Sequence, residues 1–225
     1  MVHTPRTSPP PPQLVKYRKK WTARFQAALA TGSQHDWATA HAKRVLRTAL
    51  RDLAYGKCVF CESALGVTTY LEIEHYVAKT VNSELAFEWT NLLPACRLCN
   101  NAKGEQDHKG TLLKPDAEDP EPYFWINPDT GKLEPHPRLD EAQSNRANET
   151  IRLCNLQRPA LCTKRVEMLM RVLRWLSGAE LTGSEWEALS SPNQEYKLVL
   201  RHALEIRGHY ALAEYDRKRF RSATI

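Results

Sequence analysis

Apolar residues recur at intervals of three and four positions in two stretches near the start of the chain. In residues 17–31 they are Trp21, Phe25, Ala28 and Leu29. This spacing places them on one face of a helix, and Gly32 follows as a helix stop. A second set with helical spacing runs from Trp37 to Leu53, and Asp36 is its predicted cap.

Residues 1–16 carry no such pattern. They are polar and rich in proline, with four consecutive prolines from Pro9 to Pro12. This composition is typical of a polyproline arm or a disordered lead rather than a packed element.

The period of the pattern changes between residues 69 and 104. Leu71 and Ile73 alternate with Glu72 and Glu74, as in a short strand with two different faces. A second short extended segment follows, and then a brief helix closed by Gly104. We therefore predict two short strands and one helix in this region.

The remainder of the chain divides into a turn-rich part and a helical part. Six prolines lie in residues 105–138, and the run from Asn127 to Gly131 predicts a tight turn between two short extended segments. From about Leu139 the helical spacing returns, with expected breaks near Pro159 and at Gly208.

Composition and charge narrow the classes of function. The chain has 225 residues, 42% of them hydrophobic, which is enough for an ordinary core. Its net charge of +6 and its pI of about 9.0 favour a polyanionic partner, although the same charge also aids solubility. No apolar run is long enough to cross a bilayer and no signal peptide is evident, so we expect a cytoplasmic protein without membrane association.

Four of the six cysteines form two Cys-x-x-Cys pairs, Cys58 with Cys61 and Cys96 with Cys99. Each pair can direct two thiolates at one ion, and two pairs complete the closed tetrahedral site of a structural zinc. The spacing therefore predicts a Cys₄ zinc site. The other two cysteines lie in apolar, helical contexts and are interpreted as buried hydrophobic residues.

Candidate catalytic residues lie between and beside these cysteine pairs. Glu74 and the side-chain carbonyl of Asn100 offer the hard oxygen ligands that Mg²⁺ or Mn²⁺ prefers. His75 has an ordinary pKa near neutrality and can accept a proton from an attacking water. Glu72 is an alternative ligand if the strand register differs by two residues. This set of residues fits metal-dependent phosphodiester hydrolysis.

Three further residues have supporting roles in this hypothesis. Asn91 is expected to fix the imidazole, or the loop that carries it, by a hydrogen bond. Lys79 and Lys103 are expected to contact the phosphate backbone of the nucleic acid.

Taken together, these motifs resemble the HNH endonuclease signature, in which a ββα-metal finger is held by a Cys₄ zinc. The resemblance assigns the general base to His75, the middle asparagine to Asn91, and the ligands of the catalytic ion to Glu74 and Asn100. Ala78 departs from the family pattern, which usually has proline there, but this change removes no catalytic group.

The likeness extends beyond the finger. Matching strings include GKCVFCE at 56–62, NPDTGKLEP at 127–135 and ETIRLCNLQRPALCTKR at 149–165. They resemble the HNH effectors of retron and Septu anti-phage systems over roughly three quarters of the chain. The resemblance implies an ATPase subunit as partner and, in a retron, a reverse transcriptase with its RNA and DNA products.

The resulting prediction is a mixed α+β protein with a ββα-metal finger embedded in helical flanks. Its expected segments are an N-terminal flank (1–54), the nuclease core (55–112), a connector (113–138) and a helical C-terminal region (139–225). The expected activity is metal-dependent cleavage of nucleic acid, with DNA favoured and RNA such as transfer RNA as the alternative substrate. A non-catalytic zinc module that binds nucleic acid or a protein is the competing hypothesis.

Overall fold

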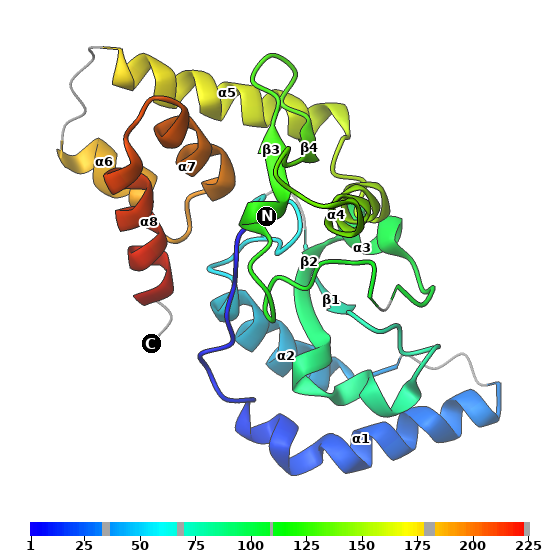
Figure 1. Ribbon diagram of the computed structural model, residues 1–225. Helices are drawn as coiled ribbons and strands as arrows, with labels where there is room; N and C mark the ends of the chain where they lie inside the picture. Colours follow the sequence, from blue (N-terminus) through cyan, green and yellow to red (C-terminus); the bar gives the residue numbers. More distant parts are fainter. Residues whose placement is uncertain (33–36, 67–69, 109, 178–182, 223–225) are drawn as a thin grey trace.

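The computed structural model describes residues 1–32, 37–66, 70–108, 110–177 and 183–222 (Figure 1). It is a mixed α+β structure, which confirms the predicted fold class. The elements in chain order are α1 (Pro12–Ala30), α2 (Ala40–Leu53), β1 (Leu71–His75), η1 (Ser83–Phe87), η2 (Trp89–Asn91), β2 (Leu92–Cys96), α3 (Arg97–Lys103), η3 (Glu121–Tyr123), β3 (Phe124–Ile126), β4 (Leu133–Pro135), α4 (Glu141–Leu153), α5 (Pro159–Leu176), α6 (Gly183–Ser190), α7 (Lys197–Ile206) and α8 (Tyr210–Ser222).

A ββα unit lies at the centre of the molecule. β1 and β2 pair antiparallel, in a register that runs from Leu71 opposite Cys96 to His75 opposite Leu92. α3 begins directly after β2 and contacts both strands. It ends at Gly104, whose φ of 69° is readily adopted by glycine. The two strands, the helix and its glycine stop are therefore as predicted.

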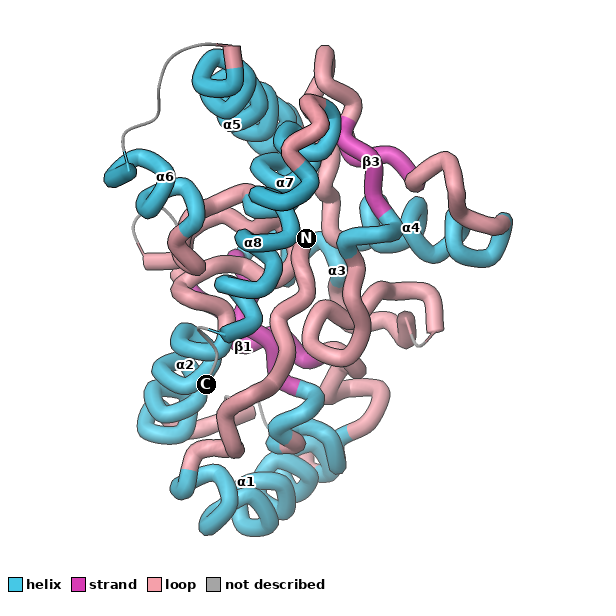
Figure 2. Tube along the Cα trace, turned by 60° about the vertical axis from the view of Figure 1, so that its left-hand side comes forward, coloured by secondary structure: helices cyan, strands magenta, loops and turns pink. Residues whose placement is uncertain are grey.

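Two hydrophobic clusters lie on either side of this unit. Consecutive β2 residues divide between them, since Leu92 belongs to the cluster formed with α1, α2 and η1, and Leu93 belongs to the larger cluster formed with α4, α5 and α7. Successive side chains of a strand point in opposite directions, which explains the division. Figures 1 and 2 show α1 and α2 at one end of the molecule and α5 at the other, with the ββα unit between them.

The prediction for residues 1–16 is wrong. Val2 and Leu14 are buried, and α1 already begins at Pro12. The amide of Thr4 donates to the carbonyl of Pro115 at 2.7 Å, and Arg6 binds the Asp116 carboxylate. Proline suits the first turn of a helix because that position needs no N–H donor. Buried apolar residues and these two polar contacts together hold the proline-rich segment against the rest of the molecule.

The start of α2 also differs from its prediction. The helix begins at Ala40, and its N-cap is Thr39, whose side chain accepts a hydrogen bond from the amide of Ala42. Asp36, the predicted cap, lies outside the described residues. The buried face of α2 consists of Ala42, Leu46, Leu50 and Leu53, as its apolar spacing indicates.

The C-terminal region follows the predicted breaks. Pro159 is the first residue of α5, and α7 and α8 are separated at Gly208, whose φ is 78°. A buried ionic network joins α7 and α8, because the Asp216 carboxylate contacts Lys197 at 2.5 Å and Arg201 at 2.8 Å. Both predicted buried cysteines of this region, Cys154 and Cys162, are buried.

No helix in the described part of the chain is both long and apolar enough to cross a membrane. The segment boundaries near residues 54, 112 and 138 stay predictions.

Candidate functional site

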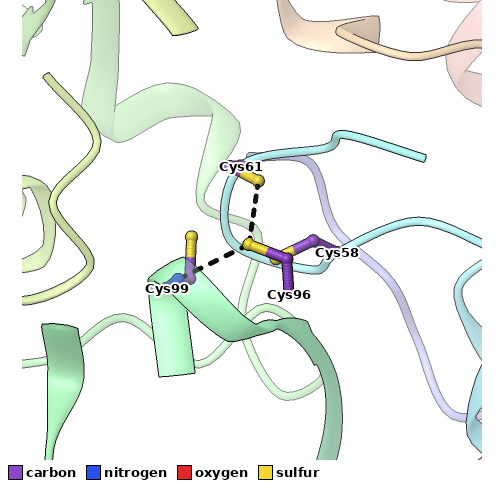
Figure 3. Close-up of side chains that lie close together, drawn as sticks. All are labelled: Cys58, Cys61, Cys96 and Cys99. Carbon is purple, nitrogen blue, oxygen red and sulfur yellow. Dashed lines mark hydrogen bonds between the residues drawn. The ribbon is translucent and has the colours of Figure 1, made fainter. Parts of the chain in front are cut away.

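Four cysteine side chains converge between the loop that follows α2 and the β2–α3 junction. The sulfurs of Cys58, Cys61, Cys96 and Cys99 all lie within 4.8 Å of one another, and all four residues are buried (Figure 3). The Cys61 and Cys96 sulfurs are 3.8 Å apart. Four thiolates about 2.3 Å from one zinc ion would be about 3.8 Å apart, so this donor set fits a tetrahedral zinc.

Local backbone geometry explains why each pair converges. In the first turn the amide of Glu62 donates to the Cys58 carbonyl at 2.9 Å, and Glu62 adopts a left-handed φ of 64°. In the second, Cys96 caps α3, and its sulfur accepts a hydrogen bond from the amide of Cys99 at 3.4 Å. A helix N-terminus favours negative charge, so this position suits a thiolate.

An arginine from the C-terminal region borders the same cluster. Arg158, the residue preceding α5, places its guanidinium nitrogens 3.5 Å from the Cys99 sulfur and 3.8 Å from the Cys96 sulfur. It also donates to the carbonyls of Cys154 and Asn155. Four thiolates around Zn²⁺ carry a net charge of −2, and a fixed cation at this distance offsets part of it.

A cavity of about 400 Å³ opens beside the ββα unit. Its lining comes from the β1 strand and the following loop, from α3, and from α2 with the residues before it. The lining residues are Trp37, Lys43, Arg47, Glu72, Ile73, Glu74, His75, Ala78, Lys79, Asn100, Asn101, Gly104 and Glu105. Predicted catalytic residues His75, Glu74 and Asn100 thus border one space, together with the alternative ligand Glu72.

The His75 ring is held on two sides. Its Nε2 lies 3.0 Å from the carbonyl of Ala86, and the ring of Trp37 contacts it edge-on with centroids 4.6 Å apart. Because a carbonyl can only accept, Nε2 carries the proton and Nδ1 is the basic nitrogen. Burial lowers the pKa of His75 to about 4, so its imidazole is neutral near neutral pH. A neutral, oriented imidazole is the form that a general base requires.

Glu74 is buried against Lys103. The Lys103 Nζ lies 2.6 Å from a Glu74 oxygen and donates to the backbone carbonyl of His75 at 2.9 Å. Burial raises the pKa of Glu74 to about 7, while the lysine charge opposes that rise. A divalent cation beside this carboxylate would favour its ionised form.

Asn100 is paired with the alternative ligand. Its Nδ2 donates to a Glu72 oxygen at 2.5 Å, and both side chains are partly exposed to the cavity. The amide oxygen of Asn100 and the carboxylates of Glu72 and Glu74, all from residues that line the cavity, are the hard donor type that Mg²⁺ or Mn²⁺ prefers. The choice between the two glutamates as ligand stays a prediction.

Asn91 lies behind the cavity and is absent from its lining. Its Oδ1 accepts from the amide of Val77 at 2.8 Å, and its Nδ2 donates to the carbonyls of Val77 and Leu85. These bonds join the loop after His75 to the η1 segment, which also contains Ala86, the hydrogen-bond partner of His75. This geometry is compatible with the positioning role expected for Asn91.

The two lysines expected to contact phosphate occupy different environments. Lys79 borders the cavity and pairs with Glu105 at 3.0 Å. Lys103 is only 2% exposed, which argues against its predicted contact with nucleic acid. Its ammonium group points inward because the Glu74 carboxylate and the His75 carbonyl offer acceptors that balance its burial.

Sequence reasoning did not place Trp37, Lys43, Arg47 or Arg158 at these sites. Trp37 is predicted only as part of an apolar helix face. The basic residues of that helix are predicted most simply as a solvated face, with contact to phosphate as the second possibility. Arg158 has no predicted role. Helical spacing does place Lys43 and Arg47 on one side of α2, but nothing local indicates that this side borders the cavity.

Comparisons with known proteins agree with this geometry. Residues 58–106 match the HNH endonuclease family. A "Septu protein PtuB" from Bacillus thuringiensis is 32% identical over 122 residues, covering 53% of this chain and 44% of the relative. A second "Septu protein PtuB", from Bacillus mycoides (strain KBAB4), is 29% identical over 154 residues, covering 55% of this chain and 50% of the relative.

Two limits of the likeness follow from these values. The chain spans about half the length of these relatives or less. The part of the chain that matches these relatives is also shorter than the three quarters of the chain over which the sequence motifs outside the finger suggest a resemblance. Both relatives are Septu proteins by name, and neither name refers to a retron.

Proposed function

Because the chain carries an HNH endonuclease domain, we propose that it hydrolyses phosphodiester bonds of nucleic acid with a divalent ion, DNA being the favoured substrate. The supporting observation is that His75, Asn100 and two glutamates border one cavity beside a buried cluster of four cysteines. The cysteines would hold zinc and stabilise the ββα unit, which is too small to bury much surface alone.

The chain's own residues suit the proposed reaction. Nδ1 of His75 accepts a proton from a water molecule as the water oxygen attacks phosphorus, and the bond from phosphorus to the leaving sugar oxygen then breaks. The Ala86 carbonyl and the Trp37 ring keep the imidazole in one orientation. Asn100 and the glutamates would hold a divalent ion, which stabilises charge on the phosphate and the leaving oxygen when bound.

The first prediction concerns His75. Replacing His75 with alanine is expected to lower cleavage by about 10²–10⁴-fold, the usual contribution of a general base, without loss of zinc. Cleavage of plasmid DNA and of transfer RNA with Mg²⁺ or Mn²⁺ measures this effect, and zinc content is determined on the same samples. The matched control is His41→Ala, because His41 is exposed on α2 and does not line the cavity.

Two results would refute the proposal. One is cleavage by His75→Ala at the wild-type rate, which would exclude the base assignment. The other is an intact, zinc-loaded wild-type protein that binds nucleic acid but cuts neither substrate with either ion, which would favour a non-catalytic zinc module.

The second prediction separates the two glutamates. Glu74→Gln is expected to weaken Mn²⁺ binding more than Glu72→Gln, because Glu74 directly precedes the base and is the more buried of the two. Titration of Mn²⁺ followed by electron paramagnetic resonance measures the affinity directly. The reverse order would transfer the ligand role to Glu72.

The resemblance to Septu effectors supports a role in anti-phage defence with an ATPase subunit. We include both in the proposal, whereas a reverse transcriptase is not part of it. Affinity purification of the tagged chain from its native host, followed by mass spectrometry, should recover an ATPase in stoichiometric amount. Recovery of the chain without an ATPase would contradict this part.

A further inference from the structure

We propose that Lys43 and Arg47 of α2 bind backbone phosphates of the DNA strand that enters the cavity. This inference rests on the proposed nuclease function and names residues that hold its substrate. Both side chains line the same cavity as His75 and Asn100, although α2 lies outside the ββα unit and outside the matched HNH region.

The position of α2 explains how these cations reach the cavity. One face of the helix is fully buried through Ala42, Leu46 and Leu50, each 0% exposed, and Thr39 caps its first turn. The buried face fixes the rotation of the helix about its axis. Lys43 and Arg47, one turn apart, then lie on the face that borders the cavity.

The spacing of the two cations suits a nucleic acid backbone. Residues four apart on a helix have Cβ atoms about 5–6 Å apart. Each strand of duplex DNA carries one phosphate per about 3.4 Å of helix axis. Two long, flexible basic side chains at this separation can therefore bind neighbouring phosphates of one strand, on the α2 side of the phosphodiester bond that the water activated by His75 would attack.

The other cations near the cavity are poorer candidates. Lys103 is buried beneath the site and contacts Glu74, and Lys79 lies in the turn after β1 rather than on a helix. Arg47 is exposed and Lys43 is partly exposed, so α2 presents positive charge toward the opening. Because Lys43 and Arg47 lie on a rigid, capped helix, their backbone loses little conformational entropy when they bind phosphate.

The test compares Lys43→Gln/Arg47→Gln with the control Lys20→Gln/Arg44→Gln. The control removes the same charge from exposed residues of α1 and α2 that do not line the cavity. All variants carry His75→Ala to prevent cleavage. Fluorescence anisotropy measures the dissociation constants of duplex DNA, single-stranded DNA and RNA between 50 and 200 mM salt.

The expected signature is a weaker dependence on salt. Losing two phosphate contacts reduces the slope of log K against log salt by about 1.8 for duplex DNA and about 1.4 for single strands. Raising the salt from 50 to 200 mM weakens binding by some factor in the parent protein, which carries His75→Ala alone. In the Lys43→Gln/Arg47→Gln variant this factor should be about 12 times smaller for duplex DNA, or about 7 times smaller for single strands. The control should keep the slope of the parent protein.

Four outcomes decide the matter. A slope reduced by the expected amount with duplex or single-stranded DNA supports the proposal. An unchanged slope in the Lys43→Gln/Arg47→Gln variant, when the chain with His75 intact cuts DNA, overturns this inference and leaves the proposed function standing. A reduced slope with RNA alone overturns the assignment to DNA, and absence of nucleic acid binding by the parent defeats both proposals.

Discussion

The cysteine cluster and the open cavity share the ββα unit but differ in access to solvent. Cys99 is 0% exposed, whereas its neighbour Asn100 lines the cavity. Consecutive residues of a helix point about 100° apart, so one short helix serves a closed site and an open site together. Structural metal sites are closed by protein ligands, while catalytic sites keep a position for water or substrate.

The side chains of the cysteine cluster and of the cavity also differ in the kind of metal ion that they suit. Four soft thiolates leave no free position around a zinc ion, and Arg158 is placed beside two of them. The cavity instead offers carboxylates, an amide and an imidazole, which suit a hard, partly hydrated ion and an attacking water. Stability and proposed chemistry are therefore assigned to different faces of one unit.

The largest expected effect comes from breaking the closed side. Cys96→Ser removes a zinc ligand while its hydroxyl can still cap α3, so the change isolates the metal, and structural zinc sites contribute about 10–16 kcal/mol of apparent binding energy. We expect loss of zinc and of folded structure, measured by metal analysis and circular dichroism. Cys162→Ser is the control because Cys162 is buried away from the cluster. Equal zinc content and helicity in both variants would contradict the structural role.

A smaller effect on stability is expected from breaking the buried Lys103–Glu74 pair next to the cavity. Lys103→Met leaves the buried Glu74 without its cation and should destabilise the fold by about 3–5 kcal/mol. Lys79→Met breaks the pair with the exposed Glu105 and should cost less than about 1 kcal/mol. Denaturant unfolding of both variants measures the contrast. Similar losses would mean that Lys103 is not held as the structure indicates.

The smallest expected effect is on zinc affinity and comes from replacing Arg158 beside the cysteine cluster. Arg158→Gln should lower zinc affinity by about 10–100-fold, the usual range for a residue that supports metal ligands. Arg158→Lys keeps the charge but not the forked geometry, so it should recover only part of the affinity. Competition with a chromophoric chelator measures the constants. Arg152→Gln, which removes an exposed charge, is the control, and an equal loss in that variant would exclude a specific role for Arg158.

The sequence by itself determined the features that depend on local spacing. A Cys-x-x-Cys turn brings two thiols together in any fold that contains it, and the periodicity of α2 identified its buried face before its neighbours were known. Breaks at Pro159 and Gly208 were equally predictable, since proline fixes φ and lacks an N–H, while glycine readily adopts the positive φ that ends a helix. The neighbouring positions of Glu74 and His75 likewise needed no structure.

Only the tertiary structure decided which sides of these elements meet. Lys79 and Lys103 look alike in the sequence, yet one borders the cavity and the other is buried under Glu74. Arg158 reaches thiols 59 and 62 residues away, and the first residues of the chain dock on the loop that contains Asp116. Such contacts depend on how whole helices and loops rotate and pack to bury apolar surface, which no local pattern of residues specifies.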